Sequence, residues 1–161
     1  MAPIETERLT VELQSPEQAR AALDALSPAD RSEVSPDCLA RIAAATSPDP
    51  WLHGFALSDR ATGVLVGTAS FKGPPDAEGV VEIAYAIAPE HRGNGYATEA
   101  AAALAAFAFA ATGVRVVRAH TAPEPNASAR VLTKCGFQRI GEVIDPEDGL
   151  VWRWERSAEA T

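Results

Sequence analysis

The chain has 161 residues, of which 14 are Lys or Arg and 22 are Asp or Glu, and its formal net charge is −8. This length fits one domain, and a composition that is 47% hydrophobic and 22% charged is that of an ordinary globular protein. The acidic balance excludes a sequence-independent nucleic-acid binder, because neutralising phosphates requires a basic face. Two cysteines are too few for a disulfide framework, so we expect a cytoplasmic protein.

The first third of the sequence predicts one strand followed by two helices. Residues 6–13 alternate apolar and polar side chains, with the period of two that is typical of a β-strand. Ser15-Pro16-Glu17 and Ser35-Pro36-Asp37 each combine an N-cap residue, a proline at the first helical position and an acid in the first turn, which is the signature of a helix start. No cationic, apolar leader precedes the strand, and the most apolar run, residues 100–111, is short and mostly alanine. We therefore expect neither secretion nor a membrane span.

The rest of the chain alternates strands and helices. Short apolar runs bounded by Gly, Pro or Asp predict strands over residues 54–58, 64–71, 80–88, 114–121, 137–144 and 150–155. Helical spacing predicts helices over residues 96–112 and 126–135, the second ended by Gly136. This order predicts a single α/β domain in which helices pack on a mixed sheet.

The most informative stretch runs from Val81 to Glu99, where a predicted strand, a turn with two glycines and the start of the long helix follow one another. Glycines let the backbone come close to a ligand, and the free N–H groups of a first helical turn bind anions. The pattern therefore predicts a phosphate site, in which any side chain at Gly95 would intrude on the phosphate; the alternative is an ordinary strand–turn–helix connection. A dinucleotide fingerprint fails because Thr98 stands where Gly or Ala is needed, and a P-loop fails because Gly-Lys-Ser/Thr does not occur.

Three segments in this order resemble the GNAT superfamily of N-acetyltransferases. Residues 92–97, Arg-Gly-Asn-Gly-Tyr-Ala, are similar to its pyrophosphate loop, (Gln/Arg)-x-x-Gly-x-(Gly/Ala); residues 82–90 resemble its central strand, and residues 126–137 its second cofactor motif. The opening residues 5–9, Glu-Thr-Glu-Arg-Leu, resemble the ribosomal-protein (RimJ/RimL-type) branch. The resemblance implies one N-acetyltransferase domain over residues 1–161, with an acetyl-CoA-binding core at 80–137 and acceptor-side helices within 1–50. It also implies a mostly antiparallel sheet of about seven strands, splayed at the central strand and flanked by about four helices.

The resemblance implies acetyl-coenzyme A as the acetyl donor and coenzyme A as the product. Backbone N–H groups of the turn would hold the pyrophosphate, and the pantetheine arm would pair with the central strand. The residues implied to contact the cofactor are Ile87, Ala88, Arg92, Gly93, Asn94, Gly95, Tyr96, Ala97, Thr98, Asn126 and Ser128. Residues 90–134 hold five Lys or Arg against three Asp or Glu, a local positive balance that suits a polyanionic cofactor.

Glu82 is the candidate general base, because an amine must lose its proton before it can attack a thioester. The family often uses a carboxylate at this position of the central strand; the alternative is a solvent-facing residue or a structural partner of Arg118 or Arg115. Many members carry a tyrosine proton donor where this sequence has Leu132. Ser128, Tyr85 or solvent is therefore expected to protonate the leaving thiolate, and the N–H near Ile87 to stabilise the oxyanion.

We expect direct acetyl transfer, in a ternary complex, to a primary amine that is either a protein N-terminus or a small cationic amine. Residues 1–50 hold nine Asp or Glu and four Arg, including Asp30, Glu33 and Asp37, and such a negative wall would attract an ammonium group; the alternative is that these acids serve solubility. A coenzyme A-binding module without catalysis is the second interpretation of the whole chain. We expect no metal site, no nucleic-acid or membrane partner, and a monomer or homodimer.

Overall fold

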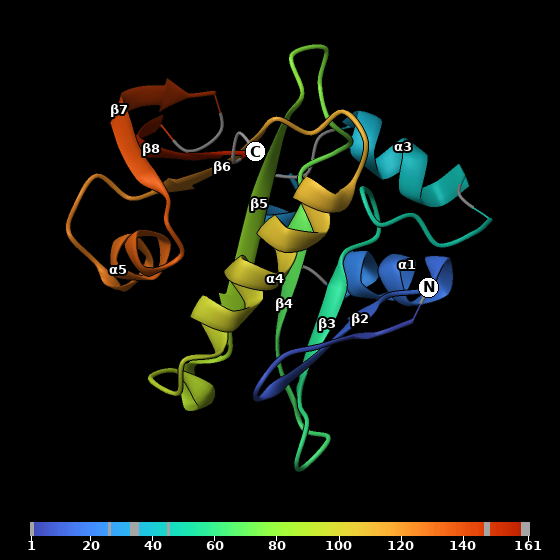
Figure 1. Cartoon of the computed structure of the whole chain (residues 1–161). Helices are drawn as coiled ribbons and strands as arrows, with labels where there is room; N and C mark the ends of the chain where they lie inside the picture. The colour runs from blue at the N-terminus through green and yellow to red at the C-terminus, as the bar shows by residue number, and fades with distance from the viewer. Residues whose placement is uncertain (1, 26, 33–35, 45, 147–148, 159–161) are drawn as a thin grey trace.

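The computed structural model describes residues 2–25, 27–32, 36–44, 46–146 and 149–158. Eight strands form one sheet in the order β1-β2-β3-β4-β5-β6-β8-β7 (Figure 1). The strands are β1 (Ile4–Glu5), β2 (Leu9–Leu13), β3 (Phe55–Asp59), β4 (Leu65–Phe71), β5 (Val80–Ile87), β6 (Val116–Thr121), β7 (Gln138–Asp145) and β8 (Gly149–Ser157). The helices are α1 (Pro16–Asp24), α2 (Pro28–Ser32), α3 (Pro36–Ala44), α4 (Tyr96–Ala110) and α5 (Ala127–Lys134), with a 3-10 turn at Pro89–His91.

The expected mixed, mostly antiparallel sheet is confirmed, since β5 and β6 are the parallel pair and the other neighbours run antiparallel. The structure adds two short elements to the prediction. Strand β1 and helix α2 have two and five residues, which is too short for a hydrophobic period to show in the sequence. Ser35, the expected cap of α3, lies outside the described residues.

The splay at the central strand is also confirmed. Strand β5 pairs with β6 at Val80–Glu82 but with β4 over Ile83–Ile87, so its second half parts from β6 (Figure 1). Glu82 accepts from the N–H of Lys72 and Ala88 donates to Val66, which places the backbone groups of even-numbered residues toward β4. By strand alternation, the N–H and C=O groups of Tyr85 and Ile87 turn toward the gap.

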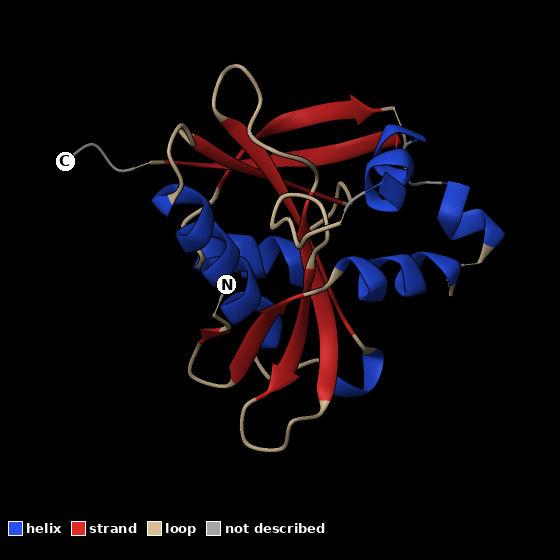
Figure 2. Ribbon diagram, turned by 90° about the vertical axis from the view of Figure 1, so that its right-hand side faces the viewer, coloured by secondary structure: helices blue, strands red, loops and turns tan. Residues whose placement is uncertain are grey.

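Helix α4 covers the sheet beside this gap and packs against β5, β4, β2 and β6. Its side chains at Ala100, Ala101, Leu104, Ala105 and Ala108 are fully buried, and because most of them are methyl groups the helix can lie close to the strands. Figure 2 shows α4 on one side of the sheet and α1 and α3 on the other. No helix within the described part of the chain has the length and hydropathy of a membrane span.

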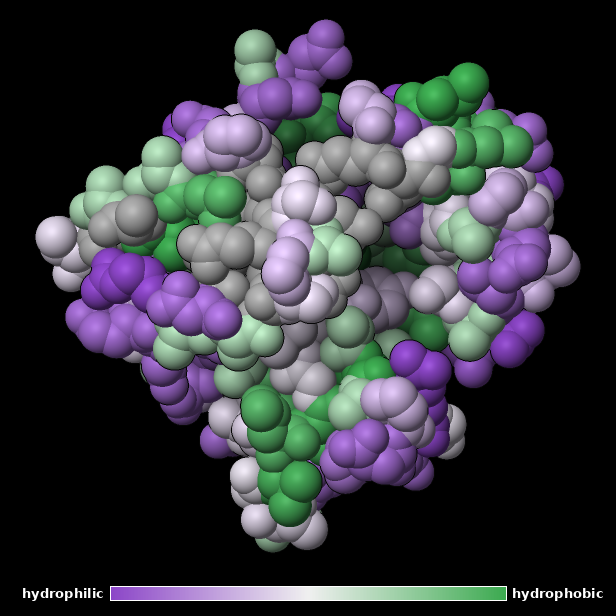
Figure 3. All heavy atoms as spheres, turned by 180° about the vertical axis from the view of Figure 1, so that it is seen from behind, coloured by the Kyte–Doolittle hydropathy of each residue, from purple (hydrophilic) through white to green (hydrophobic). Residues whose placement is uncertain are grey.

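Large apolar side chains that remain exposed lie mainly on two hairpins. Val64 immediately precedes β4 and Leu65 is its first residue, while Ile144 and Leu150 are paired near the turn between β7 and β8. Seen from behind, hydrophobic atoms form patches that are separated by hydrophilic ones, and the surface is hollowed near its centre (Figure 3). The exposed apolar residues therefore do not form one continuous face in this view.

Candidate active site

The turn before α4 leaves its helix N-terminus open. Gly95 is the N-cap residue, with a left-handed φ of 82°, and no side chain of the described chain caps this end. The first hydrogen bond within the helix runs from the backbone N–H of Glu99 to the Gly95 carbonyl, at 3.2 Å. The N–H groups of Tyr96, Ala97 and Thr98 therefore precede the hydrogen-bond ladder of the helix. Free N–H groups and the positive end of the helix dipole suit an anion such as a phosphate.

A cavity of about 570 Å³ lies between this turn, the second half of β5 and helix α5. Every residue that the sequence implied for the cofactor lines it, except Ala88 and Asn94. The lining also includes Tyr85, His91, Arg130 and Lys134. Sequence reasoning did not single out the two α5 cations as site residues, although their spacing from Asn126, at positions 130 and 134, is that of one helix face.

Ala88 and Asn94 lie outside the lining of the cavity and make hydrogen bonds within the protein. Ala88 donates to the Val66 carbonyl at 2.8 Å and accepts from the His91 N–H at 2.9 Å, so both of its backbone groups already have a partner. Asn94 uses its side-chain amide to bind the His91 carbonyl at 3.0 Å, and its own carbonyl accepts from Arg8. Contact of a ligand with Ala88 stays a prediction from the resemblance, although both backbone groups of Ala88 have partners in the structure, and Asn94 stabilises the turn.

Tyr85 of β5 and Ser128 of α5 both line the cavity, and their side chains lie close enough to interact. Burial raises the pKa of Tyr85 to about 12, so the phenol keeps its proton at neutral pH. Ser128 reaches this position because Asn126 caps α5, its side chain accepting from the Ala129 N–H at 2.9 Å. Leu132, which stands at the position of the family's tyrosine, is fully buried in the core. Tyr85 is thus a protonated phenol that lines this cavity together with the Ser128 hydroxyl.

Glu82 lies three residues before Tyr85 and outside the lining of the cavity. Its Oε2 atom is 3.2 Å from Lys72 Nζ and 3.1 Å from His120 Nδ1, whereas Arg118, an expected partner, binds Glu155 at 2.7 Å. Arg153 donates through Nε to His120 Nε2 at 3.0 Å. Because Nε2 accepts, the imidazole proton is placed on Nδ1 and is donated to Glu82. The carboxylate is therefore held by two neighbours from β6 and the end of β4.

Cys135 lies beside the same helix start, where its Sγ contacts the Thr98 carbonyl at 3.4 Å. Burial raises the pKa of this thiol, which keeps it in the unreactive protonated form at neutral pH. The structure thus places Cys135 in the packing between α4 and the end of α5.

Comparisons with known proteins agree with this architecture. The model of the family described as "Acetyltransferase (GNAT) domain" matches residues 3–138. The N-acetyltransferase YoaA of Bacillus subtilis (strain 168) is 34% identical over 87 residues, which are 54% of this chain and 49% of that protein. The chain thus spans about half the length of the relatives that it matches.

Solved structures share the fold. A GNAT-family acetyltransferase from Bacillus anthracis superposes with a TM-score of 0.69 at 22% identity, covering 96% of this chain and 98% of that one. RimL, a ribosomal L7/L12 alpha-N-protein acetyltransferase in complex with coenzyme A, superposes with a TM-score of 0.70 at 14% identity, covering 96% and 97%. With the family match over most of its length, the chain belongs to the GNAT acetyltransferase family.

Proposed function

We propose that this protein transfers an acetyl group from acetyl-coenzyme A to a primary amine, by direct attack in a ternary complex. The observation that carries the proposal is the single cavity that the uncapped end of α4, the open half of β5 and the cationic side of α5 share. Coenzyme A combines a polyanionic end with an amide-rich arm. This cavity offers N–H groups and cations for the polyanionic end, and for the arm it offers a stretch of strand backbone that β6 does not pair.

The fit can be assigned residue by residue. The N–H groups of Gly93 and of residues 95–98 would hold the pyrophosphate, with the side chains of Arg130 and Lys134 supplying positive charge from α5. The pantetheine arm would pair with the backbone of Tyr85 and Ile87, which faces the gap. The Ile87 carbonyl accepts from Arg92 Nε at 3.3 Å. The pantetheine arm would therefore run next to the turn that holds the pyrophosphate.

The chemical step needs a base, an oxyanion donor and an acid. Glu82 would take the proton of the amine through a water molecule, because the carboxylate does not itself line the cavity. The amine nitrogen then bonds to the acetyl carbon while the carbon–sulfur bond breaks, and the N–H of Ile87 stabilises the carbonyl oxygen. The Tyr85–Ser128 pair donates a proton to the departing thiolate. His120 and Lys72 hold Glu82 in place during the reaction.

The acceptor is proposed as a protein N-terminus or a small cationic amine, in line with the resemblance of residues 5–9 to the ribosomal-protein branch. Of the acids suggested as an attractive wall, Asp37 is exposed and pairs with Arg41 at 3.4 Å, which offsets its charge. Glu33 and the side chain of Asp30 lie outside what the structure describes. The acceptor is best identified by a panel of amines assayed for release of free coenzyme A.

One observation supports a second candidate, a coenzyme A-binding module without catalysis. Leu132 is buried where many members of the family carry their proton-donating tyrosine. Calorimetry with coenzyme A together with the amine panel separates the two candidates. Binding with turnover supports the enzyme, whereas tight binding without turnover on any amine supports the module.

The Glu82→Gln variant tests the mechanism. We expect turnover to fall by about 10²–10⁴-fold while coenzyme A affinity stays unchanged, and the loss to shrink at high pH, where the amine loses its proton without help. Glu155→Gln is the matched control, because it also removes an ion-paired carboxylate, in register with Glu82 but two strands away across the sheet. Wild-type turnover in Glu82→Gln at neutral pH would return Glu82 to a structural role.

A further inference from the structure

Arg8 lies far from the cofactor turn in the sequence and binds it in the structure. Its Nη1 donates to the Asn94 carbonyl, and its Nε is 3.0 Å from Glu99 Oε2, so one guanidinium contacts both the turn and the first turn of α4. The backbone N–H of Arg8 also donates to Glu99 Oε1 at 2.8 Å. One side chain from the segment between β1 and β2 therefore contacts a residue before Gly95 in the sequence and a residue after it.

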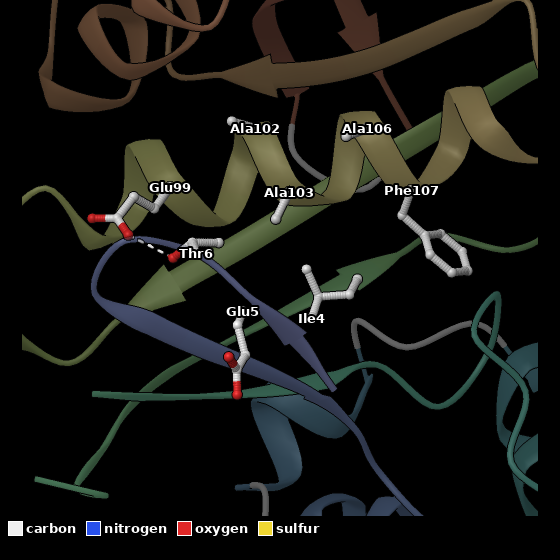
Figure 4. Close-up of a pocket in the computed structure, with 8 residues that line it drawn as sticks. All are labelled: Ile4, Glu5, Thr6, Glu99, Ala102, Ala103, Ala106 and Phe107. Atoms are coloured by element: carbon white, nitrogen blue, oxygen red, sulfur yellow. Dashed lines mark hydrogen bonds between the residues drawn. The ribbon is translucent and has the colours of Figure 1, made fainter. Parts of the chain in front are cut away.

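The partner acid is nearly buried. The side chain of Glu99 is 15% exposed, and Thr6 donates to its Oε1 atom at 2.5 Å (Figure 4). These groups stand at one end of a groove of about 550 Å³ between β1 and α4, whose other end is apolar, with Ile4 and Phe107. A carboxylate with so little access to water depends on its cationic neighbour, and within the described residues that neighbour is Arg8.

The same guanidinium fills the space behind Gly95. A Cβ at Gly95 would lie 3.0 Å from Arg8 Nη2 and 3.3 Å from Cζ. Because Gly95 has no side chain, Arg8 can lie against its backbone on one side while the cavity, and the proposed ligand, lie on the other. Any side chain at this position would push against Arg8.

The charge of Glu99 also bears on ligand binding. Glu99 belongs to the first turn of α4, which rises about 5 Å along the helix axis, so its carboxylate is within a Debye length of the free N–H groups. A bare negative charge there would oppose an incoming phosphate. Arg8 cancels that charge while it fixes the carbonyl of the turn.

We infer that Arg8 is a positioning residue for the cofactor: it holds the turn of residues 92–98 in its anion-binding conformation and neutralises Glu99 beneath it. The inference rests on the proposed function, because the anion is taken to be the pyrophosphate of coenzyme A. Arg8 acts from outside the cavity, whose lining does not include it.

The test is calorimetry with coenzyme A on matched variants. We expect Arg8→Ala to weaken binding by about tenfold or more, and Arg8→Lys to recover part of the loss, since an ammonium keeps the charge but not the fork that reaches two partners. Adding Glu99→Gln to Arg8→Ala should also recover part of it, because the uncompensated charge is gone. In steady-state assays the KM for acetyl-coenzyme A should rise more than kcat falls.

Arg60→Ala is the control for anchoring the same segment. Arg60 Nη1 donates to the Thr6 carbonyl at 2.6 Å and its Nη2 pairs with Glu5 at 3.3 Å, so this arginine binds the segment without binding the turn. We expect Arg60→Ala to change thermal stability and to leave coenzyme A affinity within about twofold. An equal loss of affinity in Arg60→Ala and Arg8→Ala would overturn the inference.

The outcomes separate the two proposals. Wild-type protein that binds no coenzyme A overturns the proposed function. Wild-type protein that binds it, with Arg8→Ala binding equally well, overturns the role of Arg8 and leaves the function standing. If Arg8→Ala fails to fold, Arg8→Lys and the double variant with Glu99→Gln decide, and coenzyme A affinity equal to wild type in both contradicts the inference.

Discussion

Three helices of this protein begin in different ways. Helix α1 has a reciprocal capping box, in which the Gln18 N–H donates to Ser15 Oγ at 3.1 Å and the Ser15 N–H donates to Gln18 Oε1 at 2.8 Å. Helix α5 is capped by Asn126. Helix α4 starts at a glycine that has no side chain to offer. A side chain of the sequence therefore supplies the acceptor at the start of α1 and α5, whereas the first N–H groups of α4 remain open to the proposed ligand.

Side chains from other parts of the chain stabilise the uncapped N-terminus of α4. Tyr96, its first residue, donates from its hydroxyl to Asp59 Oδ2 at 2.6 Å, and Arg8 binds the turn and Glu99. Asp59 ends β3 and Arg8 stands just before β2. The turn before α4 is thus held by residues of β3 and of the segment before β2, and no side chain of the described residues caps the first N–H groups of the helix.

Of the substitutions that test this difference between the helix starts, replacement of Gly95 should have the largest effect on coenzyme A affinity. We expect Gly95→Val to weaken coenzyme A binding by at least about a hundredfold, because a β-branched residue at φ 82° is strained and its Cβ meets Arg8. The sequence suggested that this Cβ would block the phosphate directly, and the structure directs it to the guanidinium instead. Calorimetry measures the loss. Gly63→Val, at φ 73° with open space around it, is the control and should cost stability alone; equal affinities in the two variants would exclude the α4 end as the binding site.

Removing the caps of α1 and α5 should have a moderate effect. We expect Ser15→Ala and Asn126→Ala each to lower the free energy of unfolding by about 1 kcal/mol, measured by urea denaturation. Only Asn126→Ala should also weaken coenzyme A binding, by a few-fold, because Asn126 positions Ser128 at the cavity. A comparable loss of affinity in Ser15→Ala would mean that the two caps do not differ in function.

Lowering the pH should weaken the stabilising hydrogen bond from Tyr96 to Asp59, and we expect this effect to be the smallest of the three. The hydrogen bond from Tyr96, followed by the N–H of Thr62, lowers the pKa of Asp59 below 3.8. Such a carboxylate stabilises the fold at pH values above its ordinary pKa, and the contribution is lost as the pH falls through the lowered value. Tyr96→Phe should therefore be less stable than wild type at pH 6, and the difference should shrink at pH 3.

Urea midpoints at the two pH values measure this difference. Asp76, whose pKa is lowered chiefly by the Val80 N–H, is untouched by the variant and keeps its own acid dependence in both proteins. If the difference in urea midpoint between wild type and Tyr96→Phe stayed constant from pH 6 to pH 3, the Tyr96 hydroxyl would stabilise the fold independently of the charge of Asp59.

The sequence by itself determined the local structure. The prolines with their flanking residues predicted the starts of α1 and α3, period-two alternation predicted β2, and the glycines of residues 93–95 predicted a turn ahead of α4 that is open to an anion. These signals lie within a few residues of one another, so each acts through its own backbone conformation. They also predicted that the end of β5, the turn and the start of α4 lie together at one cavity, because these three segments are consecutive in the chain.

Only the tertiary structure decided which distant side chains complete the site. The contacts of Arg8 with the turn, of Tyr85 with Ser128, and of Glu82 with His120 and Lys72 join residues from separate strands and helices. Their pairing depends on strand register and on the point where β5 leaves β6, which no local pattern encodes. The physical reason is that a hydrogen bond or ion pair between side chains needs ångström-level placement, which packing across the whole sheet supplies.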